Sequence, residues 1–190
     1  MDPAPCPSQT VGPYFHLGCI HPRSISCLAG PGARGERVRL ICRVLDGDGV
    51  PVSDSMIEIW QADSNGTYHH PEDPRAQGVD PDFSGFGRLA SDEGGICIFQ
   101  TIKPGRVPGN NSTWQAPHLN VSVFARGIMK RLATRIYFAG DAANLQDPTL
   151  ALVPSERRDT LMAQPDPQAD SDWRFDIHLC GERETVFFDV

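Results

Sequence analysis

The chain has 190 residues, a length that suits one domain built around a single core. Hydrophobic residues make up 39% and charged residues 22%, so the composition is that of a globular protein rather than a disordered one. A net charge of −7 with only two lysines argues against nucleic acid or an anionic membrane surface as a partner.

The chain begins MDPAPCPSQT, without the basic-then-apolar order of a secretory signal, and no apolar run is long enough to span a bilayer. The six cysteines show neither C-x-x-C nor zinc-site spacing. We therefore expect free thiols and a cytoplasmic protein.

Residues 1–37 are rich in Pro and Gly and carry no hydrophobic periodicity. We predict an N-terminal arm with little regular structure over 1–37, followed by one domain over 38–190. The simplest interpretation of the arm is an extended segment that covers a sheet edge.

From residue 38 onward, short apolar or alternating runs bounded by turn residues predict strands. These runs are 38–45, 56–61, 83–89, 95–101, 118–124, 134–138, 173–179 and 186–190. Trp60 is expected in the core. Asp147-Pro148 supplies an N-cap and a first helical residue, which predicts a short helix through Leu152, with further helical turns over 155–162. Many short strands and few helices predict an all-β fold, a single β-sandwich domain with long loops.

The central stretch 103–124 leads from a Pro-Gly turn through a polar loop into the strand that starts at His118. Loops that deliver the chain to a strand edge commonly carry binding residues. Asn120 follows two residues later, and alternation puts both side chains on one face. A pair His-x-His would be a strong metal signal, and His-x-Asn is half of one.

Seven motifs follow one another along nearly the whole chain. They are PSQTVGPYFHLG (7–18), IEIWQADSNGTY (57–68), FSGFGRLASDEGG (83–95), TIKPG (101–105), APHLNVSVFARG (116–127), TRIYFAGD (134–141) and ETVFFDV (184–190). As a set, they make the chain resemble the intradiol ring-cleaving dioxygenases, whose fold is also a β-sandwich.

Catalytic members of that family hold ferric iron with two tyrosinates and two histidines, a donor set that suits a hard cation. The resemblance places the four ligand positions at Tyr68, Val107, His118 and Asn120, and replaces an arginine of the catalytic chains by Gln115. Valine offers no donor and asparagine only a neutral amide oxygen. Two of the four ligands are therefore missing, and we expect a degenerate pocket without a metal.

The two surviving ligand-type residues also have purely structural interpretations. Tyr68 fits a turn tyrosine with a buried ring and a bonded hydroxyl, and His118 fits a satisfied histidine at a strand start. A metal held by Tyr68, His118 and His69 or His70 is a third possibility. Adjacent histidines point to opposite sides of an extended chain, which disfavours a shared metal.

Within the family, a degenerate iron pocket marks the alpha chain of the two-chain members that cleave protocatechuate. The resemblance therefore implies an alpha chain that is inactive alone and pairs with an Fe(III)-bearing beta chain, in a hetero-oligomer of αβ pairs. The pair would insert both atoms of O₂ across the bond between the two hydroxylated ring carbons of protocatechuate. The product would be 3-carboxy-cis,cis-muconate, in the beta-ketoadipate pathway of aromatic catabolism.

The resemblance also implies which residues of this chain reach the site that it shares with the beta chain. Thr10, Gly12 and Tyr14 of the arm would line the substrate's route. Arg126, in the FARG motif, would attract the substrate carboxylate. Taken alone, Arg126 is equally well a solvated arginine at a strand exit.

Two functions of other classes stay open. A stand-alone intradiol dioxygenase with an altered iron site would bind iron by itself. A non-enzymatic β-sandwich binding domain would tolerate the loss of Arg126 without effect on any paired activity.

Overall fold

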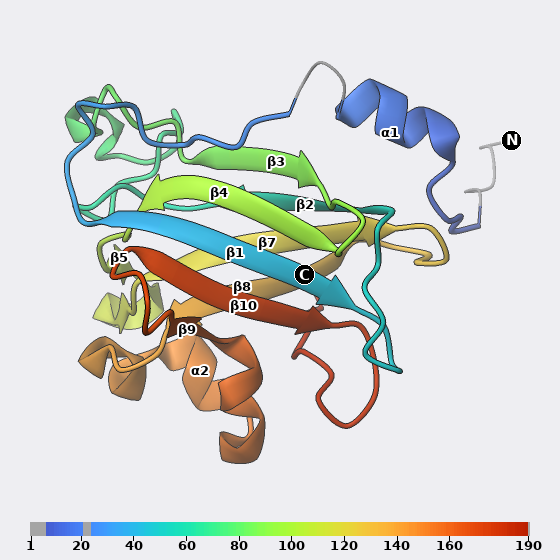
Figure 1. Ribbon diagram of the computed structural model, residues 1–190. Helices are drawn as coiled ribbons and strands as arrows, with labels where there is room; N and C mark the ends of the chain where they lie inside the picture. The colour runs from blue at the N-terminus through green and yellow to red at the C-terminus, as the bar shows by residue number, and fades with distance from the viewer. Residues whose placement is uncertain (1–6, 21–23, 190) are drawn as a thin grey trace, which may run out of the picture.

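The computed structural model describes residues 7–20 and 24–189. Eight strands form one sheet in the order β3-β2-β7-β8-β9-β10-β1-β4, and β5 pairs with β6 in a separate hairpin. Their bounds are β1 Arg37–Leu45, β2 Ser55–Trp60, β3 Phe86–Ala90, β4 Ile96–Ile102, β5 Val107–Pro108, β6 Trp114–Gln115, β7 His118–Ala125, β8 Leu132–Phe138, β9 Met162–Pro165 and β10 Asp172–His178. The sheet bends into two layers, with β10, β1 and β4 in one and β3, β2, β7 and β8 in the other (Figure 1). The predicted all-β sandwich is confirmed.

The short strand β9 joins the two layers. It pairs in parallel with β8, with Met162 opposite Tyr137, and antiparallel with β10, with Pro165 opposite Trp173. The sequence did not predict this strand, because only one of its four residues is buried and no alternation results.

The core lies between the layers and follows the predicted alternation. Strand β10 buries Trp173, Phe175 and Ile177, while the residues between them are exposed. The Trp173 ring meets Phe138 of β8 edge-on, with ring centroids 4.9 Å apart, which ties the layers together near β9. A smaller cluster packs β8 against the following helical turns; it consists of Ala116, Tyr137, Leu150, Val153 and Leu161.

Helix α2 (Pro148–Leu152) begins where the sequence predicts it. The Asp147 carboxylate accepts hydrogen bonds from the backbone N–H groups of Thr149 and Leu150, as an N-cap does. The further turns predicted after it are a 3₁₀ segment, η4 (Ser155–Leu161). Three other 3₁₀ turns are η1 (Ala76–Gly78), η2 (Asn110–Ser112) and η3 (Ala142–Gln146).

The N-terminal arm is more regular than the sequence predicted. Helix α1 (Pro13–Cys19) occupies its first half, on the opposite side of the sandwich from α2 (Figure 1). Pro13 starts this helix, a position where its fixed φ and missing N–H carry no penalty. Further on, Ile25 bridges to the edge strand β3, and Cys27 bridges to the other edge strand, β4. The second half of the arm therefore covers sheet edges, as its simplest interpretation anticipated.

The predicted final strand over 186–190 is wrong in its extent. Within the described residues it is reduced to one bridge, between Phe188 and Ala133 of β8. Next to that bridge, the Thr134 side chain rather than a backbone N–H bonds the Val186 carbonyl, so no ladder forms along β8.

The five cysteines that the structure describes are free thiols, and Cys6 lies outside the described residues. Within 7–20 and 24–189, no helix has both the length and the apolar character needed to cross a membrane.

Candidate functional site

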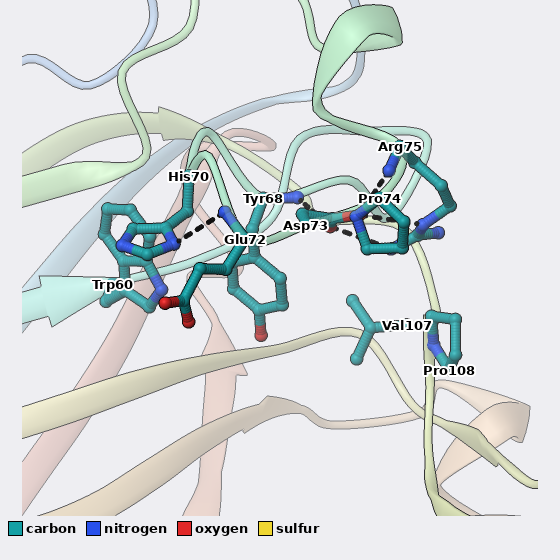
Figure 2. Close-up of a pocket in the computed structure, with 9 residues that line it drawn as sticks. All are labelled: Trp60, Tyr68, His70, Glu72, Asp73, Pro74, Arg75, Val107 and Pro108. Atoms are coloured by element: carbon teal, nitrogen blue, oxygen red, sulfur yellow. Dashed lines mark hydrogen bonds and ion pairs between the residues drawn. The ribbon is translucent and has the colours of Figure 1, made fainter.

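The loop after β2 and the hairpin strand β5 enclose a cavity of about 630 Å³. Tyr68 and Val107, two of the four degenerate ligand positions, both line it (Figure 2). The two segments approach so closely that a Cβ on Gly66 would lie 1.9 Å from the Arg106 carbonyl oxygen. Gly66 also has φ +77°, a conformation that favours glycine. Glycine at position 66 therefore allows the loop that carries Tyr68 to pack closely against the start of β5.

Tyr68 is held in place from three directions. Its backbone N–H donates to the Asp73 carboxylate at 2.9 Å, and its ring stacks on Trp60 with centroids 5.9 Å apart. The Asn120 amide donates to its hydroxyl at 3.4 Å. Burial raises the pKa of the Tyr68 phenol, so the hydroxyl stays protonated at neutral pH. The hydroxyl is bonded, as the structural interpretation of Tyr68 requires, but the residue is only half-buried.

Trp60 was expected in the core and instead forms a wall of this cavity. It is the last residue of β2, where the strand leaves the sandwich, and it is only half-buried. Alternation puts its side chain on the face opposite the buried Ile57 and Ile59, where Tyr68 of the following loop supplies the stacking partner.

His118 lies at the start of β7 and is 2% exposed. Its Nδ1 donates to the Ala116 carbonyl at 2.7 Å, and its ring lies 5.7 Å from Tyr137. Burial lowers the pKa of His118 to about 4, and the positive charge of Arg135 adds to the shift. The imidazole is therefore neutral at physiological pH, and it also matches its structural interpretation.

The donor set does not fit a ferric ion. Val107 is buried and faces the cavity with a methyl surface. The Asn120 Nδ2 donates to the Trp60 carbonyl and the Tyr68 hydroxyl, both at 3.4 Å, and its side-chain oxygen, a neutral amide oxygen, is a poor replacement for an imidazole. The proposed extra donors do not complete a shell, because His69 Nδ1 bonds the Phe83 carbonyl and His70 meets the edge of the Trp60 ring.

Guanidinium groups also lie near these residues: Arg75 lines the pocket, and Arg135, which the sequence analysis did not single out, lies on β8. Arg135 lies directly opposite Asn120 in the β7–β8 ladder, and its Nη1 donates to Gln115 Oε1 at 2.7 Å. By resemblance, the catalytic chains carry an arginine where this chain has Gln115. This region nevertheless keeps a guanidinium, because Arg135 of β8 supplies one. The sequence could have indicated this residue, because Arg135 is a charged residue within the otherwise mostly apolar strand TRIYF.

The residues expected at a shared site gather at the other end of β7. The Gly127 backbone N–H donates to Thr10 Oγ1 at 2.6 Å, and Gly12 and Arg126 line one cavity of about 390 Å³. Tyr14 on α1 is 83% exposed. Arg126 is also largely exposed, and its Nε lies 3.1 Å from Asp54. We call Thr10, Gly12, Tyr14 and Arg126 the arm cluster.

The arm cluster is well separated from the degenerate pocket. His118 and Asn120 are the first and third residues of β7, whereas Arg126 follows its last residue, and the strand has 8 residues. At roughly 3.4 Å per residue, the two places are on the order of 20 Å apart. The arm cluster and the degenerate pocket are therefore separate sites at opposite ends of β7.

Comparison with known proteins agrees with this architecture. A family model described as "Dioxygenase" matches residues 11–181. The chain resembles the solved dioxygenase domain from Streptomyces sp. SirexAA-E at a TM-score of 0.62 and 25% identity, over 94% of this chain and 99% of that one. It also matches catechol 1,2-dioxygenase from Acinetobacter sp. ADP1 at a TM-score of 0.65 and 22% identity, over 86% and 60% of the two chains, a likeness of fold alone. The chain belongs to the intradiol ring-cleaving dioxygenase family.

The curated relatives narrow this assignment. The chain is 42% identical to the protocatechuate 3,4-dioxygenase alpha chain of Burkholderia cepacia, over 97% of this chain and 96% of the relative. Identity is also 42% with the corresponding alpha chain of Pseudomonas putida, over 96% and 95%. The beta chain from Burkholderia cepacia is 36% identical over 80% of this chain and 67% of its own length. Alpha and beta chains are thus separate proteins in this branch, and the similarity to the alpha chains extends over more of the sequence.

Proposed function

We propose that this chain is the alpha chain of a protocatechuate 3,4-dioxygenase and works in the cytoplasm as part of a hetero-oligomer with a beta chain. The complex would cleave 3,4-dihydroxybenzoate with O₂ to 3-carboxy-cis,cis-muconate, a step of aromatic catabolism in the beta-ketoadipate pathway. The observation that carries the proposal is the 42% identity to two alpha chains over almost the full length of both sequences.

The Fe(III) of such a complex belongs in the beta chain. In this chain, Val107 has no donor atom and Asn120 offers only a neutral amide, so the pocket lacks one of the two phenolates and one of the two imidazoles that ferric iron needs. The catechol would chelate such an iron in the partner through its two ring oxygens, and the metal would supply the activation toward O₂. This chain would contribute binding groups rather than a metal.

The arm cluster is the part of this chain that we assign to the shared site. Its polar groups are exposed: Tyr14 stands out from α1, and the Arg126 guanidinium is only partly engaged by Asp54. The hydrogen bond from Gly127 to Thr10 keeps the arm beside Arg126. A beta chain docked over this end of the sandwich would contact Arg126, whose guanidinium can bind the substrate carboxylate. It would also contact the N-terminal arm, which would line the route of the substrate into the shared site.

The test uses the co-purified αβ complex and two substrates. Arg126→Gln should raise KM for protocatechuate by about tenfold, the loss of one charge-assisted hydrogen-bonding group, with kcat little changed. Catechol lacks the carboxylate, so its KM should not change. Arg43→Gln is the matched control, because Arg43 is also an exposed arginine paired with a carboxylate, Asp176. An equal effect on both substrates would contradict the role of Arg126.

Iron content and visible absorption of the chain purified alone complete the test. We expect a colourless, iron-free and inactive protein, since ferric tyrosinate absorbs strongly in the visible. Near-stoichiometric iron would instead support a stand-alone enzyme with a rearranged ligand set. A beta chain that is fully active without this chain would favour the non-enzymatic binding domain.

A further inference from the structure

A second polar cavity, of about 460 Å³, adjoins the degenerate pocket and shares Pro108 with it. The loop of η2 forms one side of this cavity, the start of α2 forms another, and Arg135 of β8 contributes its only charged side chain. We call it the Arg135 cavity. Its lining residues are Pro108, Gly109, Asn110, Asn111, Thr113, Gln115, Arg135, Pro148, Thr149 and Leu152.

Arg135 carries a positive charge that no carboxylate of the described residues neutralises. Its Nη1 donates to three neutral oxygens, on Gln115 at 2.7 Å, Thr149 at 3.1 Å and Tyr137 at 3.3 Å. Among residues 7–20 and 24–189, no salt bridge within 4.0 Å involves it. The other half-buried strand arginine, Arg88, pairs with Glu58.

Asp147 is the carboxylate closest to this network, and it is fully engaged elsewhere. Its two oxygens accept from the backbone of Ala116, Thr149 and Leu150 and from the Tyr137 hydroxyl. A partly desolvated guanidinium without a counter-ion is unfavourable, so an anion from solution would be stabilised beside Arg135.

The free edge of the guanidinium has the geometry that carboxylates prefer. Nε and Nη2 of Arg135 make no hydrogen bond within the described part of the chain, and neither is among its enclosed unpaired atoms. These two N–H groups lie side by side and can bind both oxygens of one carboxylate in parallel. The bidentate edge of Arg135 is therefore unoccupied within the described part of the chain, and the residue itself lines the cavity.

The remaining walls suit an apolar body attached to that carboxylate. Pro108 and Pro148 contribute apolar surface, and Leu152 is 84% exposed at the rim. The η2 loop above carries Asn111 and Ser112 with φ +55° and +60°, the sole non-glycine residues of the described chain with positive φ. Backbone held in such a conformation is typical of binding loops.

We propose that the Arg135 cavity binds a small organic carboxylate, with the carboxylate on the Nε–Nη2 edge of Arg135 and the apolar body against Pro148 and Leu152. This site is distinct from the arm cluster, and it needs neither a metal nor the beta chain. Carboxylate binding in the Arg135 cavity does not depend on whether the chain is the alpha chain of a dioxygenase.

Benzoate, its neutral isostere benzamide and inorganic phosphate are the probes, titrated into the full-length chain by calorimetry. We expect saturable benzoate binding that weakens with added salt, with much weaker binding of benzamide and phosphate. Arg135→Gln should weaken benzoate binding at least tenfold. Arg43→Gln, which removes an exposed arginine that is paired with Asp176 and belongs to neither site, is the matched control and should leave binding unchanged.

A second variant guards against a folding defect in Arg135→Gln. Leu152 is exposed, so Leu152→Glu should leave the melting temperature unchanged while placing a negative charge at the cavity rim. It should weaken benzoate binding severalfold. Benzoate binding that survives both Arg135→Gln and Leu152→Glu overturns the proposal, and so does benzamide or phosphate binding as tight as that of benzoate.

Discussion

Asp147 is a buried carboxylate, 1% exposed, on which three elements converge. One oxygen accepts from the Ala116 N–H at 2.7 Å, next to the start of β7. The other accepts from the Tyr137 hydroxyl of β8 at 3.1 Å and from the first N–H groups of α2. We predict that Asp147→Ala strongly destabilises the fold and loosens the region around His118.

The magnitude follows from those contacts. Loss of the N-cap costs about 1 kcal/mol. The Ala116 N–H and the Tyr137 hydroxyl would lose their partner in a buried place, at about 1–3 kcal/mol each. The free energy of unfolding should therefore fall by about 4 kcal/mol, a large part of the roughly 5–15 kcal/mol that holds a domain together. For a chain of this size the melting temperature should drop by about 10 °C.

Urea and thermal unfolding of the full-length chain, followed by tryptophan fluorescence, measure this loss. Asp176→Ala is the control: Asp176 accepts two hydrogen bonds from Arg43, at 3.0 and 2.7 Å, but the pair lies at the surface. Exposed pairs contribute at most about 1 kcal/mol. If Asp147→Ala destabilises the chain no more than Asp176→Ala does, the reasoning from buried hydrogen bonds is refuted.

Two further predictions concern the degenerate pocket. Because burial lowers the pKa of His118 to about 4, the unfolded chain binds a proton near pH 5 that the folded chain does not. Stability should be complete above about pH 6.5 and should fall by about 2 kcal/mol on going from pH 7.5 to 5, and a chemical-denaturation series on His118→Gln should lack that part of the slope. Gly66→Ala should destabilise the chain by at least about 2 kcal/mol more than Gly49→Ala, since both glycines have positive φ but only Gly66 faces the Arg106 carbonyl. Equal melting temperatures for the two alanine variants would contradict the close approach of the Tyr68 loop to β5.

Local patterns in the sequence predicted the elements whose stability is itself local or repetitive. The alternation of Trp173, Phe175 and Ile177 marked β10, because a strand with one buried face must repeat every second residue. Asp147-Pro148 marked the start of α2, because the cap and the first turn are neighbours in sequence. The four-residue strand β9 carried no such pattern, and its pairing with β8 and β10 alone defines it.

For the candidate site too, the sequence predicted some features and only the tertiary structure decided the others. The family resemblance of the sequence marks Val107 and Asn120 as ligand positions, and side-chain chemistry there predicts a poor fit to ferric iron without any structure. Tertiary structure decided what the altered positions contact: Asn120 donates to the Tyr68 hydroxyl, and Gln115 accepts from Arg135. It also placed Thr10 beside Gly127, across 117 residues of chain. Contacts between side chains so distant in sequence depend on strand order and register, which no local pattern encodes.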